Sequence, residues 1–322
     1  MRAEGLDPST LRRVEEALRR HESCHLRLRG TLPASLRAEE VLPWFDSVLA
    51  REPGLTQALA HHLPPAGADD RSGPLVTAVI PTNRGTPLGL PVLREQDLPV
   101  EVLVLVNGDA VAQGDRVMRV PWTGHGPVRQ AGVEAATGEY ILFTVDDALP
   151  RGRGCLRALV DALEEGGYDA VFGRQLAWPS TDPITAARLR AWTPPGRGHW
   201  SMDRLDHVFA LYRRETLLRH RLPAVPIGED LHWRQGRRIG YVPEAVVVHA
   251  HERRPKELYQ RTRDLHVQHH LVGDSPLIPS LAALSGALPS AFATALRAGP
   301  RELPNQLAEL LGQYRAARLS GR

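Results

Sequence analysis

The sequence predicts an α/β fold with a mainly parallel sheet, flanked by helical segments at both ends of the chain. From residue 75 onward, short apolar runs alternate with amphipathic stretches, as strands and helices do in an α/β domain. Several of these runs end abruptly in polar or acidic residues. Ligands bind at the carboxyl ends of strands in such sheets, so this pattern also predicts a binding site.

Composition limits the classes of function. The 322 residues can bury a sizeable core, and 24% charged with 42% hydrophobic residues is typical of a globular protein. The net charge is +3, but no basic run is interleaved with aromatic residues, so no nucleic acid partner is expected. Cys24 and Cys155 fit neither a metal site nor a disulfide framework, which favours a reducing compartment.

Three regions follow from the changes in pattern. Residues 1–74 are predicted to be an N-terminal helical extension, begun by an N-cap at Asp7 and closed by a Pro- and Gly-rich linker. Residues 75–272 form the α/β domain, and residues 273–322 a C-terminal helical segment. The chain shows neither a signal-peptide pattern nor about 18 consecutive apolar residues. We therefore expect a cytoplasmic protein, at most peripheral to the inner face of a membrane, which the basic rim of the C-terminal segment would contact.

The expected elements are given by residue range. Strands are predicted at 76–80, 101–106, 116–120, 140–145, 168–172 and 241–249. Helices are predicted at 127–136, 154–165, 281–296 and 305–319, with another beginning near residue 229.

Polar turns follow the first two predicted strands. Pro81, Thr82 and Asn83 follow the first strand, and Asn107 begins an Asn-Gly turn after the second. Either turn alone is weak evidence, because Pro and Asn-Gly are common turn residues. Together they would lie at one edge of a parallel sheet.

Acidic residues follow a later strand and begin a later helix. Asp146 and Asp147 end a strongly apolar strand, where a hard cation such as Mg²⁺ or Mn²⁺ would offset the cost of burying them. Glu229 and Asp230 stand at the start of a helix. Helix capping is the alternative for both pairs. His249 ends the last strand and suits Mn²⁺, although a lone strand histidine is more often structural.

Five segments together resemble the successive motifs of family 2 glycosyltransferases with the Rossmann-like GT-A fold. They are VTAVIPTNRG, VEVLVLVNGD, GPVRQAGVEAATGEYILFTVDDALP, GEDLHWR and IGYVPEAVVVHAH, and they span roughly residues 75–255. The resemblance implies transfer of a sugar from a nucleotide-sugar donor, with UDP-sugars favoured, to a saccharide, lipid-linked or other hydroxyl acceptor. It also implies inversion at the anomeric carbon, a Mn²⁺ or Mg²⁺ cofactor, and a place in cell-envelope polysaccharide or glycolipid synthesis.

The resemblance also implies a role for each motif residue. Those implied to hold the donor are Pro81, Thr82, Asn83, Asn107, Arg129 and Asp146. Asp147 is implied to bind the metal together with His249, and Asp230 of the Glu229–Asp230 pair to be the catalytic base. The chain departs from the family pattern at Val145, where the first aspartate of the metal motif is expected, and at Val106, which precedes the Asn-Gly turn.

Two other functions stay open. A catalytically degenerate domain that binds a partner through its flanking helices is the non-enzymatic alternative, for which Val145 is the best argument. Residues 84–88 are faintly similar to the Gly-rich loop of sugar-phosphate nucleotidyltransferases, but that chemistry normally needs a lysine, and Lys256 is the only one. Trp178, Trp192 and Trp200 are either platforms for an acceptor sugar or core residues.

Overall fold

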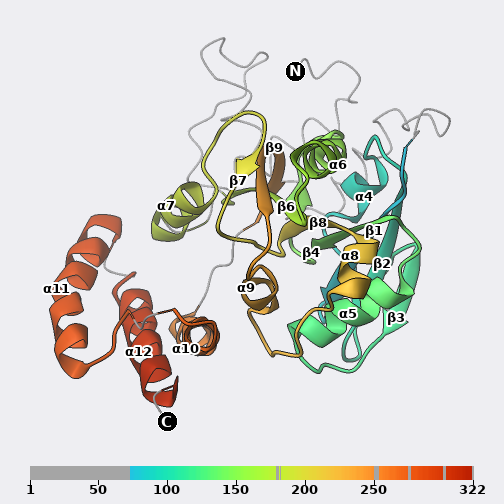
Figure 1. Ribbon diagram of the computed structural model, residues 1–322. Coiled ribbons are helices and arrows are strands. Elements are labelled where there is room, and N and C mark those ends of the chain that lie inside the picture. The colour runs from blue at the N-terminus through green and yellow to red at the C-terminus, as the bar shows by residue number, and fades with distance from the viewer. Residues whose placement is uncertain are drawn as a thin grey trace, which may run out of the picture.

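The computed structural model describes residues 73–178, 181, 183–249, 254–274, 277–299 and 302–320. The predicted N-terminal extension and almost all of its linker lie outside these residues. The described chain forms an α/β domain followed by three long helices (Figure 1).

A nine-stranded sheet forms the centre of the described domain, in the order β3-β2-β1-β4-β8-β6-β9-β5, with β7 pairing with β9. The strands are β1 (Val76–Thr82), β2 (Val100–Val106), β3 (Arg116–Arg119), β4 (Tyr140–Thr144), β5 (Leu149–Pro150), β6 (Ala170–Leu176), β7 (Trp200–Ser201), β8 (Phe209–Arg213) and β9 (Ile239–Val248). Pairing is parallel from β3 through β2 and β1 to β4, and again between β6 and β9. β8 is antiparallel to both β4 and β6, so the predicted α/β sheet is confirmed and is mixed beyond β4.

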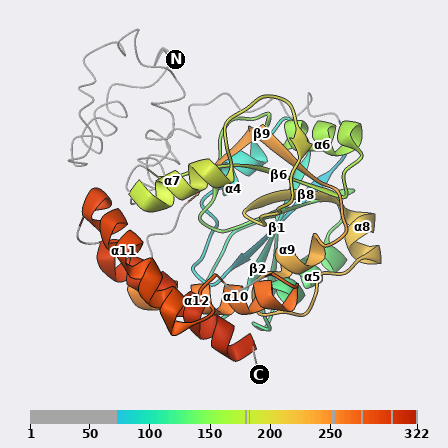
Figure 2. The ribbon, with the colours of Figure 1, turned by 60° about the vertical axis from the view of Figure 1, so that its left-hand side comes forward.

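Helices cover both faces of this sheet (Figure 2). They are α4 (Leu90–Arg94), α5 (His125–Ala135), α6 (Cys155–Gly166), α7 (Pro183–Trp192), α8 (Arg214–Arg219), α9 (Glu229–Trp233), α10 (Pro255–Leu271), α11 (Leu281–Ala298) and α12 (Leu303–Ser320). α4 and α6 pack against one face, where Ile80 and Val104 point, and α5, α8 and α9 pack against the other, where Val79 and Leu105 point. Because strand side chains alternate, each buried strand contributes to both clusters.

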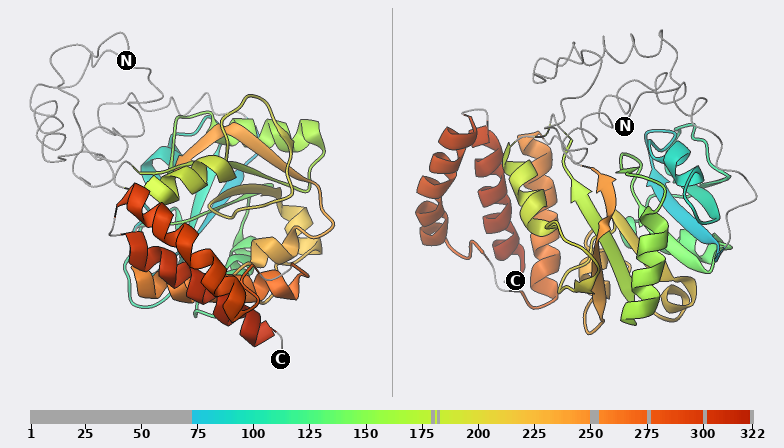
Figure 3. Two further views of the ribbon diagram at one scale, coloured as in Figure 1. Left: turned by 90° about the vertical axis from the view of Figure 1, so that its left-hand side faces the viewer. Right: turned by 90° about the horizontal axis from the view of Figure 1, so that it is seen from above.

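The last three helices stand in a row beside the α/β domain (Figure 3). α12 lies between α10 and α11 and packs on both. α11 is outermost, and only Ala291 and Ala295 of its side chains are buried. Both predicted C-terminal helices are present, whereas α10 was not predicted.

α11 bears on the expectation that no segment spans a membrane. By length and composition it is apolar enough to cross a membrane, and it is the one described helix that meets this test. The earlier criterion of consecutive apolar residues overlooked it because Ser285, Gly286, Pro289 and Ser290 interrupt its alanines and leucines.

Candidate active site

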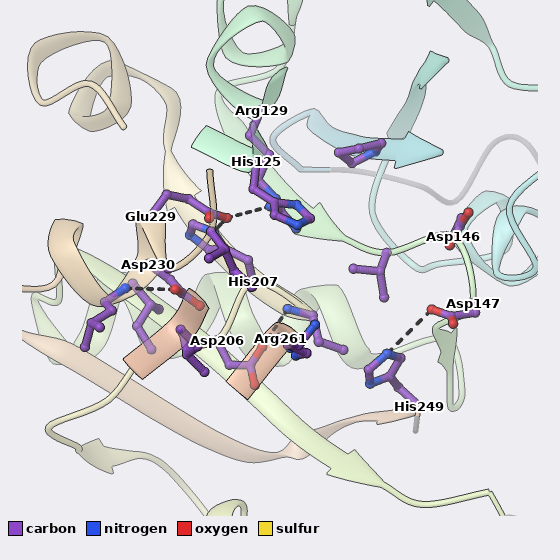
Figure 4. Close-up of a pocket in the computed structure, with 18 of the residues that line it drawn as sticks. His125, Arg129, Asp146, Asp147, Asp206, His207, Glu229, Asp230, His249 and Arg261 are labelled. Atoms are coloured by element: carbon purple, nitrogen blue, oxygen red, sulfur yellow. Dashed lines mark hydrogen bonds and ion pairs between the residues drawn. The ribbon is translucent and has the colours of Figure 1, made fainter. Parts of the chain in front are cut away.

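A cavity of about 1150 Å³ opens at the sheet edge where β1, β2 and β4 end and β8 begins. Every residue that the sequence singled out for donor, metal or base lies in its wall: Pro81, Thr82, Asn83, Asn107, Arg129, Asp146, Asp147, Glu229, Asp230 and His249. Figure 4 shows the acidic pairs Asp146–Asp147 and Glu229–Asp230 in different parts of this wall.

The turns after β1 and β2 lie at one edge of the parallel sheet, as the sequence predicted, and a hydrogen bond joins them. The backbone N–H of Asn107 donates to the carbonyl oxygen of Thr82 at 2.9 Å. Thr82 Oγ1 donates to Asp146 Oδ2 at 2.7 Å and accepts the backbone N–H of Arg84 at 3.1 Å. One buried threonine therefore joins the first strand end to the acidic strand end.

Asp146 and Asp147 do not cap the next helix. The N-cap of α6 is Gly154, with no side-chain capping bond. Instead, both carboxylates face the guanidinium of Arg84. Its Nε donates to Asp146 Oδ2 at 3.1 Å, and its Nη2 forms ion pairs with Asp146 and, at 3.1 Å, with Asp147 Oδ2. The hydrogen bond to Asp146 is the main cause that raises the pKa of Arg84 above its ordinary value.

His249 approaches the acidic strand end from β9. Its Nε2 lies 3.5 Å from Asp147 Oδ1, and its Nδ1 lies 3.2 Å from Gln175 Oε1. Gln175 Nε2 donates to Asp206 at 2.7 Å, which turns Oε1 toward the imidazole and makes Nδ1 the donor. In the neutral ring, the Nε2 lone pair then faces a carboxylate oxygen.

This arrangement fits a divalent cation. An imidazole lone pair and a carboxylate oxygen repel each other at this distance unless a positive charge lies between them. Among the described residues, no group of three or more His, Cys, Asp or Glu is arranged so that it could hold a metal ion. Asp147 and His249 would thus be two protein ligands, and phosphate oxygens and water would complete the shell, as is common for Mg²⁺. The imidazole suits Mn²⁺.

Glu229 is held in a buried network at the start of α9. Its Oε1 lies 2.5 Å from Arg129 Nη1 and 2.9 Å from His207 Nδ1, and His207 Nε2 lies 2.5 Å from the hydroxyl of Tyr212. The side chains of Arg129 and Glu229 are 6% and 4% exposed. Burial opposes ionisation of Glu229, but the charge of Arg129 and the bond from His207 outweigh it and hold its pKa below the ordinary value.

Asp230 has the opposite environment. Burial, together with the negative charge of Glu229, raises the pKa of Asp230. Its Oδ1 accepts the backbone N–H of Leu231 at 2.8 Å, while the N-cap of α9 is Gly228, with no side-chain capping bond. A carboxylate with a raised pKa is a stronger base, and it lines the cavity here.

Sequence reasoning missed several residues of the wall. Asp206 and His207 precede β8, and His125 begins α5. Burial, followed by the charge of Arg129, lowers the pKa of His125 to about 4. The apolar run of β8 was a signal that could have located the first two, because polar residues beside a buried strand end were the criterion used elsewhere.

The three tryptophans considered as sugar platforms, Trp178, Trp192 and Trp200, differ in their position relative to the cavity. Trp192 lines the cavity, and the guanidinium of Arg204 stacks on its ring at 4.4 Å. Trp200 packs edge-on against the buried Tyr241, with ring centroids 5.0 Å apart. Neither Trp200 nor Trp178 is among the residues that line the cavity.

Comparisons with known proteins agree with this geometry. Residues 94–218 match the family model described as glycosyl transferase family 2. The chain is similar in structure to the mannosyltransferase PcManGT from Pyrobaculum calidifontis, solved with GDP-Man and Mn²⁺, at 20% identity and a TM-score of 0.51, over 83% of this chain and 96% of that one. At that identity the likeness shows the fold.

More remote similarities were also found. S. aureus TarS 1-349 in complex with UDP-GlcNAc aligns at 12% identity and a TM-score of 0.40, over 77% of this chain and 92% of that one. GalNAc-T7 with UDP, GalNAc and Mn²⁺ aligns at 12% identity and a TM-score of 0.43, over 60% and 48%. A search of curated protein sequences gave no match. The match over residues 94–218 and the GT-A fold shared with PcManGT support a glycosyltransferase similar to family 2.

Proposed function

We propose that this glycosyltransferase moves a sugar from a nucleotide-sugar donor to an acceptor hydroxyl, with Asp230 as the general base. The observation that supports the proposal is that one cavity holds three features. They are Asp230, whose pKa is raised, the two turns that follow β1 and β2, and the Asp147–His249 pair. The resemblance in sequence favours a UDP-sugar, while PcManGT was solved with GDP-Man, so both nucleotides belong in the test.

The metal in this proposal is Mn²⁺ or Mg²⁺, held by Asp147 and His249. When bound, it supplies positive charge that stabilises the departing nucleoside diphosphate. Thr82 keeps Asp146 against the donor edge, and Gln175 keeps the His249 ring turned toward Asp147. We propose that the turns at Pro81–Asn83 and Asn107 bind the nucleotide base.

Asp230 takes the proton from the acceptor hydroxyl as that oxygen attacks the anomeric carbon, and the nucleoside diphosphate leaves from the opposite side. This single displacement inverts the anomeric configuration. Glu229 assists the proton transfer indirectly, because the ionised Glu229 raises the pKa of Asp230. Arg129, implied by the resemblance to lie near the diphosphate, lines the cavity but has its guanidinium paired with Glu229.

The two alternatives receive less support. In a degenerate domain, no selection would keep Asp147, Asp230 and His249 in one cavity, and all three lie there. Lys256 begins the exposed side of α10 and does not line the cavity, which leaves a nucleotidyltransferase without its phosphate-binding lysine. We further propose a saccharide, lipid-linked or other hydroxyl acceptor and a place in cell-envelope polysaccharide or glycolipid synthesis. The division of the chain into residues 1–74, 75–272 and 273–322 is likewise a proposal.

The test begins with binding. UDP, GDP, dTDP and CMP are titrated by thermal shift with and without Mn²⁺, since a ligand of the native state raises its apparent stability. We expect one nucleotide to raise the melting temperature only with metal, and Asp147→Ala to abolish that shift. No shift with any nucleotide would instead support the degenerate, partner-binding domain.

The second step tests the base. In Asp230→Asn, release of nucleoside diphosphate from the matching donor should fall by about 10²–10⁴, because general-base help is commonly worth that much. Nucleotide binding should persist. Asp161→Asn, an exposed aspartate on α6 outside the cavity, is the control. Turnover of Asp230→Asn within a few-fold of wild type would exclude Asp230 as the base.

We also propose that the protein is cytoplasmic and rests on an anionic membrane through α11 and α12. The outer side of α11 exposes Leu281, Phe292 and Leu296 at 63%, 46% and 78%. The exposed charges on these two helices are arginines, Arg297, Arg315 and Arg318, whereas Glu309 is paired with Arg188. Apolar side chains beside basic ones suit an interface of anionic lipid.

A further inference from the structure

Arg84 occupies the carboxylates at which the metal is proposed to bind. Its guanidinium reaches Asp146 through Nε and Nη2, and Asp147 through Nη2, while its side chain is 59% exposed. Other arginines of the cavity wall have other partners: Arg129 pairs with Glu229, Arg234 pairs with Asp203, and Arg204 stacks on Trp192. Arg84 thus joins the acidic strand end to the solvent-facing mouth of the cavity.

We propose that Arg84 is the resident counter-cation of Asp146 and Asp147, that a divalent metal competes with it, and that the displaced guanidinium then binds the donor diphosphate. This inference rests on the proposed function, because it assumes the metal site at Asp147 and His249. Metal and nucleotide would then bind cooperatively. The metal frees the Arg84 guanidinium for the diphosphate, and the diphosphate keeps that guanidinium away from the metal site.

Competition follows from the distances. A cation between His249 Nε2 and Asp147 would lie within a few ångströms of the Arg84 Nη2, which is 3.1 Å from Asp147 Oδ2. A divalent cation and a guanidinium at such a distance repel each other, and more strongly beside protein than in bulk water because the effective dielectric constant is lower. Arg84 therefore weakens metal binding for as long as it stays on Asp147.

The geometry also allows the side chain to leave. The backbone of Arg84 is anchored by its N–H to Thr82 Oγ1, and the neighbouring Gly85 takes a φ of +136°, in the region that favours glycine. The exposed stem can then turn about a fixed backbone. A guanidinium donates two parallel hydrogen bonds to phosphate oxygens, so a diphosphate is a better partner for it than a carboxylate already engaged by metal.

The first experiment measures Mn²⁺ binding alone, from the paramagnetic resonance signal of free Mn²⁺. Arg84→Ala should bind Mn²⁺ about two- to tenfold more tightly than wild type, because the competitor is an exposed ion pair of modest strength. Arg84→Lys should fall between the two. Arg94→Ala removes another exposed arginine that pairs with an aspartate, Asp115, outside the cavity, and should leave Mn²⁺ binding unchanged.

The second experiment measures binding of the nucleoside diphosphate by calorimetry in saturating Mn²⁺. There Arg84→Ala should bind about tenfold more weakly, because the diphosphate loses a charge-assisted partner. Equal or weaker Mn²⁺ binding by Arg84→Ala than by wild type would overturn the inference while leaving the metal site in place. Absence of Mn²⁺ binding in every variant, with or without nucleotide, would overturn the metal site and the inference together.

Discussion

Two adjacent carboxylates, Glu229 and Asp230, have pKa values shifted in opposite directions because their partners differ. Arg129 and His207 hold Glu229 ionised, whereas burial and Glu229 itself raise the pKa of Asp230. Pairs whose environments separate their pKa values commonly divide acid, base and supporting roles. The buried ion pair of Glu229 is thus best understood as the support that makes its neighbour basic.

Glu229→Gln tests this division of roles through stability. Removing one partner of a buried ion pair leaves Arg129 uncompensated, so we expect the free energy of unfolding to fall by about 3 kcal/mol near pH 7. Urea denaturation measures it. Because folding lowers the pKa of Glu229, its ionised form stabilises the folded protein. This stabilisation is present above the unfolded-state pKa of about 4.3 and is lost as pH falls through the folded-state value.

The difference between wild type and Glu229→Gln should therefore shrink in acid. Asp230→Asn is the control of opposite sign. Its pKa is raised on folding, so its ionisation costs stability as pH rises, and the variant should be as stable as wild type or more so at neutral pH. Equal stability of Glu229→Gln and wild type near pH 7 would contradict the supporting role.

The direction of each strand decided which site residues could be predicted from the sequence. Asp146, Asp147 and the turn residues follow strands that end at the cavity, and a rule about carboxyl ends finds them. Asp206 and His207 precede β8, which is antiparallel, so its amino end lies at the same edge. The sequence carries no direct mark of strand direction. Nor does it show that Arg84 faces two carboxylates more than 60 residues away in sequence.

At the level of elements, α5 carries Arg129 and packs closely on the sheet at Gly132. A Cβ built on Gly132 would stand 2.4 Å from Val79 Cγ1 and 2.9 Å from Leu105 Cδ1. Only a glycine allows this approach without movement of β1 and β2 side chains. The helix is thus placed where Arg129 meets Glu229.

Gly132→Ala should therefore shift α5 away from the sheet. We expect a loss of about 1–3 kcal/mol in the free energy of unfolding, which is typical of overpacking a core. Gly286→Ala in α11 is the matched control, since its Cβ would meet nothing within 4 Å. The control should be neutral or more stable by about 0.5–1 kcal/mol. A Gly132→Ala protein as stable as wild type would show that the contact is relaxed in solution.

Long apolar strands were predicted, whereas α10 and the short strand β8 were not. Strands such as β1, β2 and β4 are mostly apolar, because helices cover both faces. α10 buries only Leu258 and Gln268 among its described side chains, so it has little hydrophobic periodicity to detect. β8 is only five residues long, although it lies at the centre of the sheet.

For the whole molecule, the outermost helix determines what the protein can rest on. We expect flotation with vesicles of phosphatidylcholine and phosphatidylglycerol, little with phosphatidylcholine alone, and weaker binding in high salt. Phe292→Glu combined with Leu296→Glu should reduce the bound fraction about tenfold, by removing apolar contact and adding negative charge. Leu218→Glu, at an exposed leucine on α8, is the control.

Two results would contradict membrane contact. One is equal binding to both kinds of vesicle by wild type and the double variant. The other is a stable dimer, measured by light scattering, that the double variant dissociates, because the exposed face of α11 would then be covered by a second copy.

The ion pair between Arg129 and Glu229 joins residues 100 positions apart in the chain. Closing so long a loop is slow, and contacts of this kind form late in folding. During synthesis, a chain that has emerged only through Asp147 already contains the strand-end turns and the acidic pair of the donor edge. It lacks α9, and so has neither the proposed base nor the carboxylate that neutralises Arg129. It also lacks His249, the second proposed metal ligand. The order of the chain therefore completes the metal site and the base only late in synthesis, so that an unfinished polypeptide holds no competent centre.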